Sequence, residues 1–181
     1  ELLQNEFNGM ENSVKKYKGF FIGRYETGNV KADNVSVPIV KRGEFGSSGA
    51  TWYYQYANGK KVAKNTSVTS CMIWGCQWDR TLEWIVQRNE GEYSLIIDSS
   101  DWGNYSGTSF EYMDVDGTTK LKVGDKAVPT GSTERNKKNN IYDMAGNGWD
   151  WTMEAKNDTG RVHRRRKFLQ KFRLNCSSFY T

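Results

Sequence analysis

The chain has 181 residues but only two prolines, three cysteines and one histidine. So little proline excludes a proline-rich linker, and glycine without a repeat excludes collagen. No apolar run is long enough to cross a bilayer, and no signal peptide opens the chain at Glu1, which leaves an upstream targeting segment or domain open. Aromatic residues are plentiful, with seven tryptophans, and such a composition argues against disorder. The length predicts one domain with a sizeable core.

The three cysteines cannot all pair within one chain. Cys71 and Cys76 are separated by four residues, wider than the spacing of most zinc knuckles, and the lone His163 stands beside arginines. We therefore expect no disulfide scaffold, no metal site and no cofactor. The cysteines, Cys176 included, are predicted to be buried free thiols.

The formal charge of +5 is unevenly distributed along the sequence. Seven Lys/Arg and no acid lie between Arg161 and the end, so residues 1–160 hold the other 19 Lys/Arg and all 21 Asp/Glu, a net charge of −2. The body is mildly acidic, and the basic character belongs to the tail. A nucleic-acid partner is therefore not indicated by the net charge alone.

Periodicity predicts a small set of regular elements. In residues 71–88, Trp74, Trp78, Leu82 and Ile85 recur at helical spacing, with Asn89 and Gly91 as the stop. Residues 147–154 alternate apolar and small or polar side chains, which predicts a strand with one apolar face. The remaining expectations are a strand over 17–25, a strand or short helix over 51–56, a short strand over 93–97 and a long irregular region over 98–140. No βαβ rhythm is present, so the fold class predicted from these elements is α+β with much irregular structure.

Three segments in this order resemble the formylglycine-generating enzyme (sulfatase-modifying factor) family. They are GFFIGRYETGN (19–29), WDRTLEW (78–84) and NIYDMAGNGWDW (140–151). The resemblance covers roughly residues 17–162 and implies that family's variant of the C-type lectin fold. We accordingly expect a sulfatase-modifying-factor-like domain over 1–162 and an atypical basic tail over 163–181.

The phrase MIWGCQWD (72–79) is more similar to a non-enzymatic branch of the family found in gut bacteria and their prophages. This likeness implies a ligand-binding protein on a bacterial cell surface or phage particle rather than in the cytoplasm. Some members of that branch are variable proteins of diversity-generating retroelements, in which the C-terminal segment is mutated to create new specificities. The implied ligand is an unknown protein or carbohydrate, and the oligomeric state stays open.

An enzymatic role is not expected. The catalytic branch of the family holds copper between two cysteines near the C-terminus, where this chain has only Cys176. No other nucleophile, phosphate-loop or metalloprotease motif is present. Asp98 with Asp101, and Asp114 with Asp116, are interpreted as solvated turn residues rather than acid/base groups or cation ligands. A sulfatase-modifying oxidase homologue is kept as the alternative.

The 140–151 segment is expected to form the scaffold. Its signature residues are Asp143, Gly146, Asn147, Trp149, Asp150 and Trp151. In the family, N-x-x-E at this place can bind calcium, but here the acid is Asp150 and Gly148 replaces the usual valine, so we favour loop-bracing hydrogen bonds. For the two tryptophans, stacking on a ligand and packing in the core are both open, and we favour the core.

Binding is expected to be displayed from the segment that begins near Arg161. The candidate ligand-binding residues are Arg161, His163, Arg164, Arg166, Phe168 and Phe172. The family's Gly-Gly-Ser-Phe segment and closing strand are absent after Val162, and a shifted or truncated reading frame near His163 would explain both. Taken literally, the basic and aromatic tail has two further interpretations, a nucleic-acid binder or a membrane-binding amphipathic helix, neither of which we favour.

Overall fold

The computed structural model describes residues 1–32, 35–46, 51–63, 67–105, 108–114, 116, 118–122, 127–157 and 160–164. The helices are α1 (Leu2–Tyr17), α2 (Trp52–Gly59), α3 (Gly75–Arg88), α4 (Ser94–Ile97) and the 3-10 turn η1 (Glu134–Asn136). The strands are β1 (Thr27–Ala32), β2 (Val35–Val40), β3 (Glu111–Met113), β4 (Lys120–Lys122), β5 (Lys137–Lys138), β6 (Ile141–Tyr142), β7 (Asp150–Ala155) and β8 (Arg161–Arg164).

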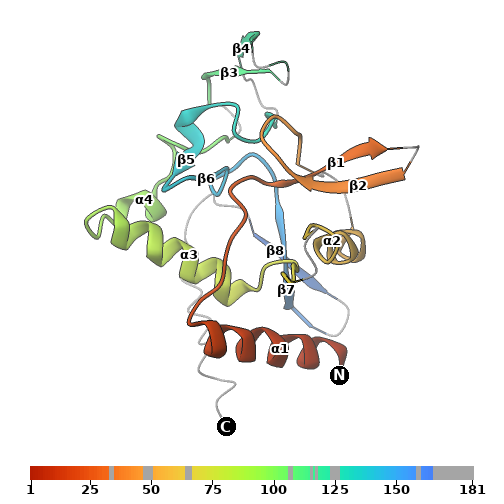
Figure 1. Ribbon diagram of the computed structural model, residues 1–181. Coiled ribbons are helices and arrows are strands. Elements are labelled where there is room, and N and C mark those ends of the chain that lie inside the picture. Colours follow the sequence, from red (N-terminus) through yellow and green to blue (C-terminus); the bar gives the residue numbers. More distant parts are fainter. Residues whose placement is uncertain are drawn as a thin grey trace.

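The described strands pair as four separate antiparallel ladders, β1–β2, β3–β4, β5–β6 and β7–β8. Helices and small antiparallel sheets alternate irregularly along the chain, which confirms the α+β class (Figure 1). The predicted boundary after Val162 falls inside β8, so the strand carries the first two residues of the predicted tail.

Helix α3 confirms the helix predicted near Cys71 to Arg88, with its start moved to Gly75. The Trp74 amide donates to the Gln77 Oε1 at 3.1 Å, so the Gln77 side chain caps the start of the helix. Trp78, Leu82 and Ile85 are buried on one face, as the spacing predicts. The predicted stop is also confirmed, because Asn89 caps the helix and Gly91, at φ 78°, donates its amide to the Val86 carbonyl at 3.0 Å.

The structure corrects two predicted strands and decides between two alternatives for a third segment. The strand predicted over 17–25 is wrong, because the segment leaves α1 through Lys18 in the left-handed region and has no regular pairing. Its Phe21 is fully exposed, and Ile22 packs against the core. The short strand predicted over 93–97 is helix α4, and of the two alternatives over 51–56 the structure has the helix, α2.

Among the described residues, two clusters of buried side chains form the core, one along α3 and the other at its start. The first joins α3 to the loops around 102–105 and 141–145, and contains Trp78, Leu82, Ile85, Trp102, Tyr105, Ile141, Met144 and Ala145. The second contains Trp52 of α2, Met72, Trp74 and Met153 of β7, and helix α1 packs on it with Leu3, Phe7 and Met10. These three side chains are partly buried, so each contributes less than the roughly 1.5–3 kcal/mol of full burial. Helix α1 is part of the fold, although it is absent from the predicted elements.

The segment between α1 and β1 brings the first family-like motif to the third. In Figure 1 it runs across the molecule from the end of α1 to β1. The Tyr142 amide of β6 donates to the Arg24 carbonyl at 2.9 Å, and the Tyr25 and Tyr142 rings stack with centroids 5.2 Å apart. Glu26 is thereby placed beside the 143–150 loop.

Candidate functional site

The β7–β8 hairpin carries the start of the predicted binding segment. Asp150 stands opposite Arg164 and Trp151 opposite His163 in the antiparallel register, and an irregularity follows before Ala155 meets Arg161. Successive side chains of a strand point to opposite faces. His163 and Trp151 therefore share one face, and Asp150 and Arg164 share the other.

An aromatic group lies on the first of these faces and is defined here as the Trp149 cluster: Trp149, Trp151 and His163. The His163 ring is 4.4 Å from the Trp149 ring and 4.9 Å from the Trp151 ring, centroid to centroid, and both contacts are edge-on. Trp149 is 57% exposed and His163 is exposed, whereas Trp151 packs on the second core. The expectation that Trp149 packs in the core is therefore wrong, because its place just before β7 directs it to the surface.

Arg164 points away from this cluster into the protein. Its guanidinium lies 2.9 Å from the Glu154 Oε2 and 2.7 Å from the Asp79 Oδ1, and its side chain is only 18% exposed. The ion pairs tie β8 to β7 and to helix α3. Sequence reasoning missed Glu154 and Asp79, although Asp79 belongs to the second family-like motif and Glu154 follows Asp150 at the strand period.

The Glu154 carboxylate also explains a glycine at the start of α3. A Cβ built on Gly75 would lie 1.9 Å from the Glu154 Cδ, so the carboxylate occupies the space of a side chain. Acidic groups at a helix N-terminus are stabilised by the helix dipole. Glycine at this position lets β7 approach α3 closely.

Asp143 and Gly146 act as internal supports, as the scaffold interpretation expects. The buried Asp143 carboxylate accepts from the Thr130 hydroxyl at 2.8 Å, the Asn136 amide at 3.1 Å and the Gly131 amide at 3.2 Å. Gly146 has φ 80°, and a Cβ there would lie 2.0 Å from the Asn104 carbonyl oxygen. Only glycine fits both the conformation and the space.

Asn147 makes the loop-bracing hydrogen bonds that its motif predicts. Its Nδ2 donates to the Glu26 Oε2 at 2.7 Å and to the Val128 carbonyl at 3.1 Å. Its Oδ1 accepts from the Val128 amide at 2.8 Å and from the Asn104 Nδ2 at 3.0 Å. One side chain thus fastens three loops that are distant in the sequence.

Glu26, Asp143 and Asp150 form a group of acids around Asn147. Burial, followed by the charges of Asp150 and Asp143, raises the pKa of Glu26 well above its usual range. Burial and the charge of Asp143 raise the pKa of Asp150 to about 7. Burial also raises the pKa of Asp143, against the hydrogen bonds that it accepts. Each acid is thus more easily protonated than a carboxyl in water.

Among the residues that the structure describes, no set of three His, Cys, Asp or Glu is arranged to hold a metal ion. The two described cysteines are free thiols, and Cys71 is exposed, so the prediction of a buried thiol is wrong there; Cys76 is half-buried. The pKa of Cys71 is raised, mainly by desolvation, which keeps the thiol protonated and weakly nucleophilic. No helix of the described chain has the length and apolarity needed to span a membrane.

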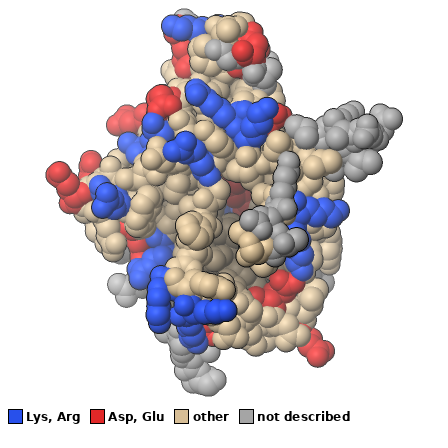
Figure 2. All heavy atoms as spheres, in the orientation of Figure 1, with Lys and Arg blue, Asp and Glu red and all other residues tan. Residues whose placement is uncertain are grey.

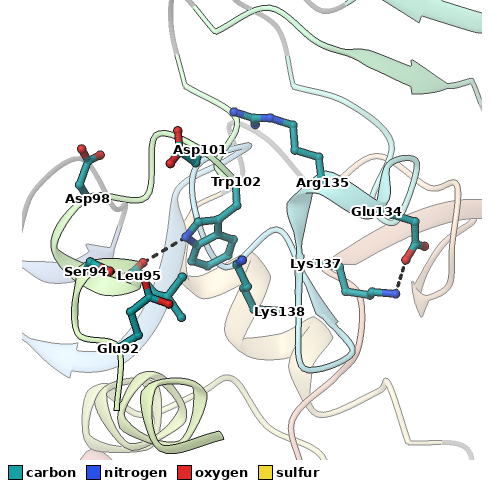
Figure 3. Close-up of a pocket in the computed structure, with 10 residues that line it drawn as sticks. All are labelled: Glu92, Ser94, Leu95, Asp98, Asp101, Trp102, Glu134, Arg135, Lys137 and Lys138. Carbon is teal, nitrogen blue, oxygen red and sulfur yellow. Dashed lines mark hydrogen bonds and ion pairs between the residues drawn. The ribbon is translucent and has the colours of Figure 1, made fainter. Parts of the chain in front are cut away.

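A second surface feature is a pocket of about 530 Å³ between α4 and β5 (Figure 3). Trp102 lies at its base, with the Lys138 ammonium 5.6 Å from the indole centroid. The other cations on this side are already engaged, since Lys137 pairs with Glu134 and Arg135 donates to the Gly103 and Ser100 carbonyls. The opposite side carries Glu92, Asp98 and Asp101.

In each acidic pair singled out in the sequence, one aspartate accepts hydrogen bonds from backbone amides of its own turn. Asp98 accepts from the Ser100 amide at 3.0 Å, and hydrogen bonds from Ser100 lower its pKa. Asp116 accepts from the amides of Thr118 and Thr119, and hydrogen bonding, chiefly from Thr119, lowers its pKa to about 2. A general acid or base works best with a pKa near the working pH, so neither group suits that role.

Three predicted ligand-binding residues, Arg166, Phe168 and Phe172, lie outside the described residues, as does Cys176. Of the other three, the structure brings His163 into the exposed Trp149 cluster and Arg164 into an internal ion pair. Arg161 lies over Trp52, with its guanidinium carbon 4.9 Å from the ring centroid. Comparison with protein-family models, curated proteins and solved structures finds no match for this chain.

Proposed function

We propose that this protein is a non-catalytic ligand-binding protein that presents its binding surface from the β7–β8 hairpin. The fold proposed for the scaffold is the formylglycine-generating-enzyme type of C-type lectin fold, on the strength of the sequence resemblance. The same resemblance places the protein among retroelement-diversified receptor-binding proteins of bacteria or prophages, displayed on a cell surface or phage particle. Its partner would be a protein or carbohydrate.

The observation that carries the proposal is the exposure of the Trp149 cluster. A tryptophan that is 57% exposed, with an exposed histidine against its ring, offers a large amphipathic contact area. Such side chains dominate the energetics of interfaces because they bury much apolar surface at little conformational cost.

The internal contacts beneath the Trp149 cluster also support this proposal. The polar groups of Asp143, Asn147 and Arg164 form hydrogen bonds or ion pairs inside the protein, and these contacts hold the hairpin in place. A rigid framework beneath an exposed aromatic surface suits binding, because little ordering remains to be done when the ligand arrives.

Two alternatives lack such support. A sulfatase-modifying oxidase needs reactive thiolates, whereas the pKa of the Cys71 thiol is raised, which disfavours the thiolate. A nucleic-acid binder would depend on the basic tail, of which the structure describes only His163 and Arg164. On the face of the described residues drawn in Figure 2, the Lys and Arg side chains form small groups with Asp and Glu between them.

The test compares two exposed tryptophans in a binding screen. Wild-type protein is applied to a glycan array and to bacterial cells, and each positive signal is titrated with Trp149→Ala and with Trp84→Ala, whose indole on α3 is 41% exposed. We expect Trp149→Ala to weaken binding about tenfold or more and Trp84→Ala to leave it within about twofold. No signal with any probe, equal losses in both variants, or copper-dependent oxidation of a cysteine peptide would each overturn the proposal.

A further inference from the structure

A groove beside Arg161 has the composition of a small-molecule site. It encloses about 570 Å³ between the start of α1, helix α2 and the β7–β8 hairpin. Its apolar lining comes from Leu2, Leu3, Trp52, Tyr53 and Ala155. Pockets of about 300–1,000 Å³ with mostly apolar walls and a few polar groups are the usual form of small-ligand sites.

Arg161 supplies the charge of this groove. Its guanidinium is stacked on Trp52 at 4.9 Å and donates one hydrogen bond, from Nη1 to the Gly160 carbonyl at 3.2 Å. The Nε is buried and has no hydrogen-bond partner, and within the described part of the chain no carboxylate pairs with Arg161. Glu1 also lines the groove, but its side chain is exposed and forms none of the ion pairs among the described residues.

The other lining groups do not compensate this charge. Asn157 stands at the hairpin turn and accepts from the Gly160 amide at 2.5 Å. Tyr53 is 71% exposed, so its ring is available at the mouth of the groove. By contrast, Lys137 beside the pocket of Figure 3 is paired with the Glu134 carboxylate. The groove therefore combines apolar walls with a cation that has no carboxylate partner among the described residues.

We propose that this groove binds a carboxylate carried on a flat apolar body, with the apolar part against the exposed side chains of Tyr53 and Leu2 and the carboxylate on Arg161. A guanidinium is suited to this role because its fork of N–H donors matches the two oxygens of a carboxylate. The stacking on Trp52 holds the fork in place before the ligand arrives. A free aromatic acid and the C-terminal aromatic residue of a peptide share this chemistry.

The experiment titrates the whole chain with 2-naphthoate and with 2-naphthamide, followed by calorimetry and by NMR. The naphthoate is expected to bind about tenfold more tightly than the neutral amide. Arg161→Gln should remove that difference, whereas Lys156→Gln, which deletes a charge on the same hairpin outside the groove, should preserve it. Tyr53→Ala should weaken both ligands to a similar extent.

A second arm separates the two sources of the ligand. N-acetyl-Gly-Trp with a free carboxylate is compared with its amidated form, and binding of the free form at naphthoate-like affinity assigns the groove to peptide C-termini. Binding of naphthoate alone assigns it to free aromatic acids.

Three results would overturn the proposal: no binding of naphthoate below about 10 mM, equal affinity of the acid and the amide, or undiminished naphthoate binding by folded Arg161→Gln. The acid-against-amide comparison uses wild-type protein, so it decides the question even where a variant does not fold. Trp149→Ala should leave naphthoate binding unchanged. A failure of the groove proposal can therefore be told apart from a failure of the binding function proposed for the Trp149 cluster.

Discussion

Arg161 and Arg164 leave the same strand three positions apart and end in opposite surroundings. Arg164 is held by Glu154 and Asp79 with its side chain 18% exposed, and it fastens β8 to β7 and α3. Arg161 is stacked on Trp52 at the edge of a groove, with no carboxylate partner among the described residues. Because strand neighbours alternate between faces, the same residue type serves the framework in one position and the surface in the other.

The largest expected effect comes from removing each of these charges in turn. Arg164→Gln leaves Glu154 and Asp79 partly buried without their cation, and we expect the free energy of unfolding to fall by about 3 kcal/mol. Arg161→Gln removes a cation–π contact and one hydrogen bond to the neighbouring Gly160 carbonyl, for which we expect a loss of about 1 kcal/mol. Urea denaturation of both variants measures the difference. Equal losses would show that the two arginines do not differ in role.

The acids beneath the hairpin predict a pH dependence of the framework. The pKa of Asp150 is raised to about 7, so the folded state binds its proton more tightly than the unfolded chain does. The stabilisation is fully present below the unfolded pKa near 4 and is lost as the pH rises through about 7. We expect about 2 kcal/mol of stability to be lost between pH 5 and pH 8.

Asp150→Asn is the matched variant for this slope, because it keeps the shape of the side chain and removes its titration. Its free energy of unfolding should change much less over the same pH range than that of the wild type. A variant that keeps the full wild-type slope would assign the effect to Glu26 or Asp143, whose pKa values are also raised.

The smallest effect is expected at the exposed end of the Trp149 cluster. Trp149→Ala should change the free energy of unfolding by about 0.5 kcal/mol or less, since the side chain is 57% exposed. Trp151→Ala should cost about 1–2 kcal/mol, because this indole packs on the second core. Thermal or urea unfolding distinguishes the two, and a larger loss for Trp149→Ala would place that tryptophan in the framework.

Some elements could be predicted because their signal is local. Helix α3 follows from the spacing of Trp74, Trp78 and Leu82, and β7 begins within the alternation over 147–154 and extends one residue beyond it. Helix α1 also has a local signal, since Leu3, Phe7 and Met10 recur at helical spacing, and the sequence predictions omit it. The strand predicted over 17–25 fails for a different reason. Aromatic and β-branched content measures only a fit to a pleated surface, and the segment has no partner strand.

The sequence predicts which segment forms the site, but it does not predict which side chains of that segment face solvent. The 140–151 motif predicts loop-bracing hydrogen bonds for Asn147 and Asp150, and the Asn147 side chain makes them. Asp143, named in the sequence only as a signature residue, also accepts internal hydrogen bonds. The exposure of Trp149 and the burial of Arg164 depend on which face of the hairpin meets α3. That choice is made by contacts such as Arg164 with Asp79, which lie 85 residues apart in the sequence.

The sequence by itself determined the α+β class, the course of α3 and the origin of the net positive charge in the last residues. Each of these is a property of composition or of short-range periodicity. The tertiary structure alone decided that Glu26 meets Asn147 across 121 residues, that Arg164 is an internal brace and that Arg161 faces a groove. The physical reason is that burial and pairing of a charge depend on which distant segments pack together, and that packing is a property of the folded chain as a whole.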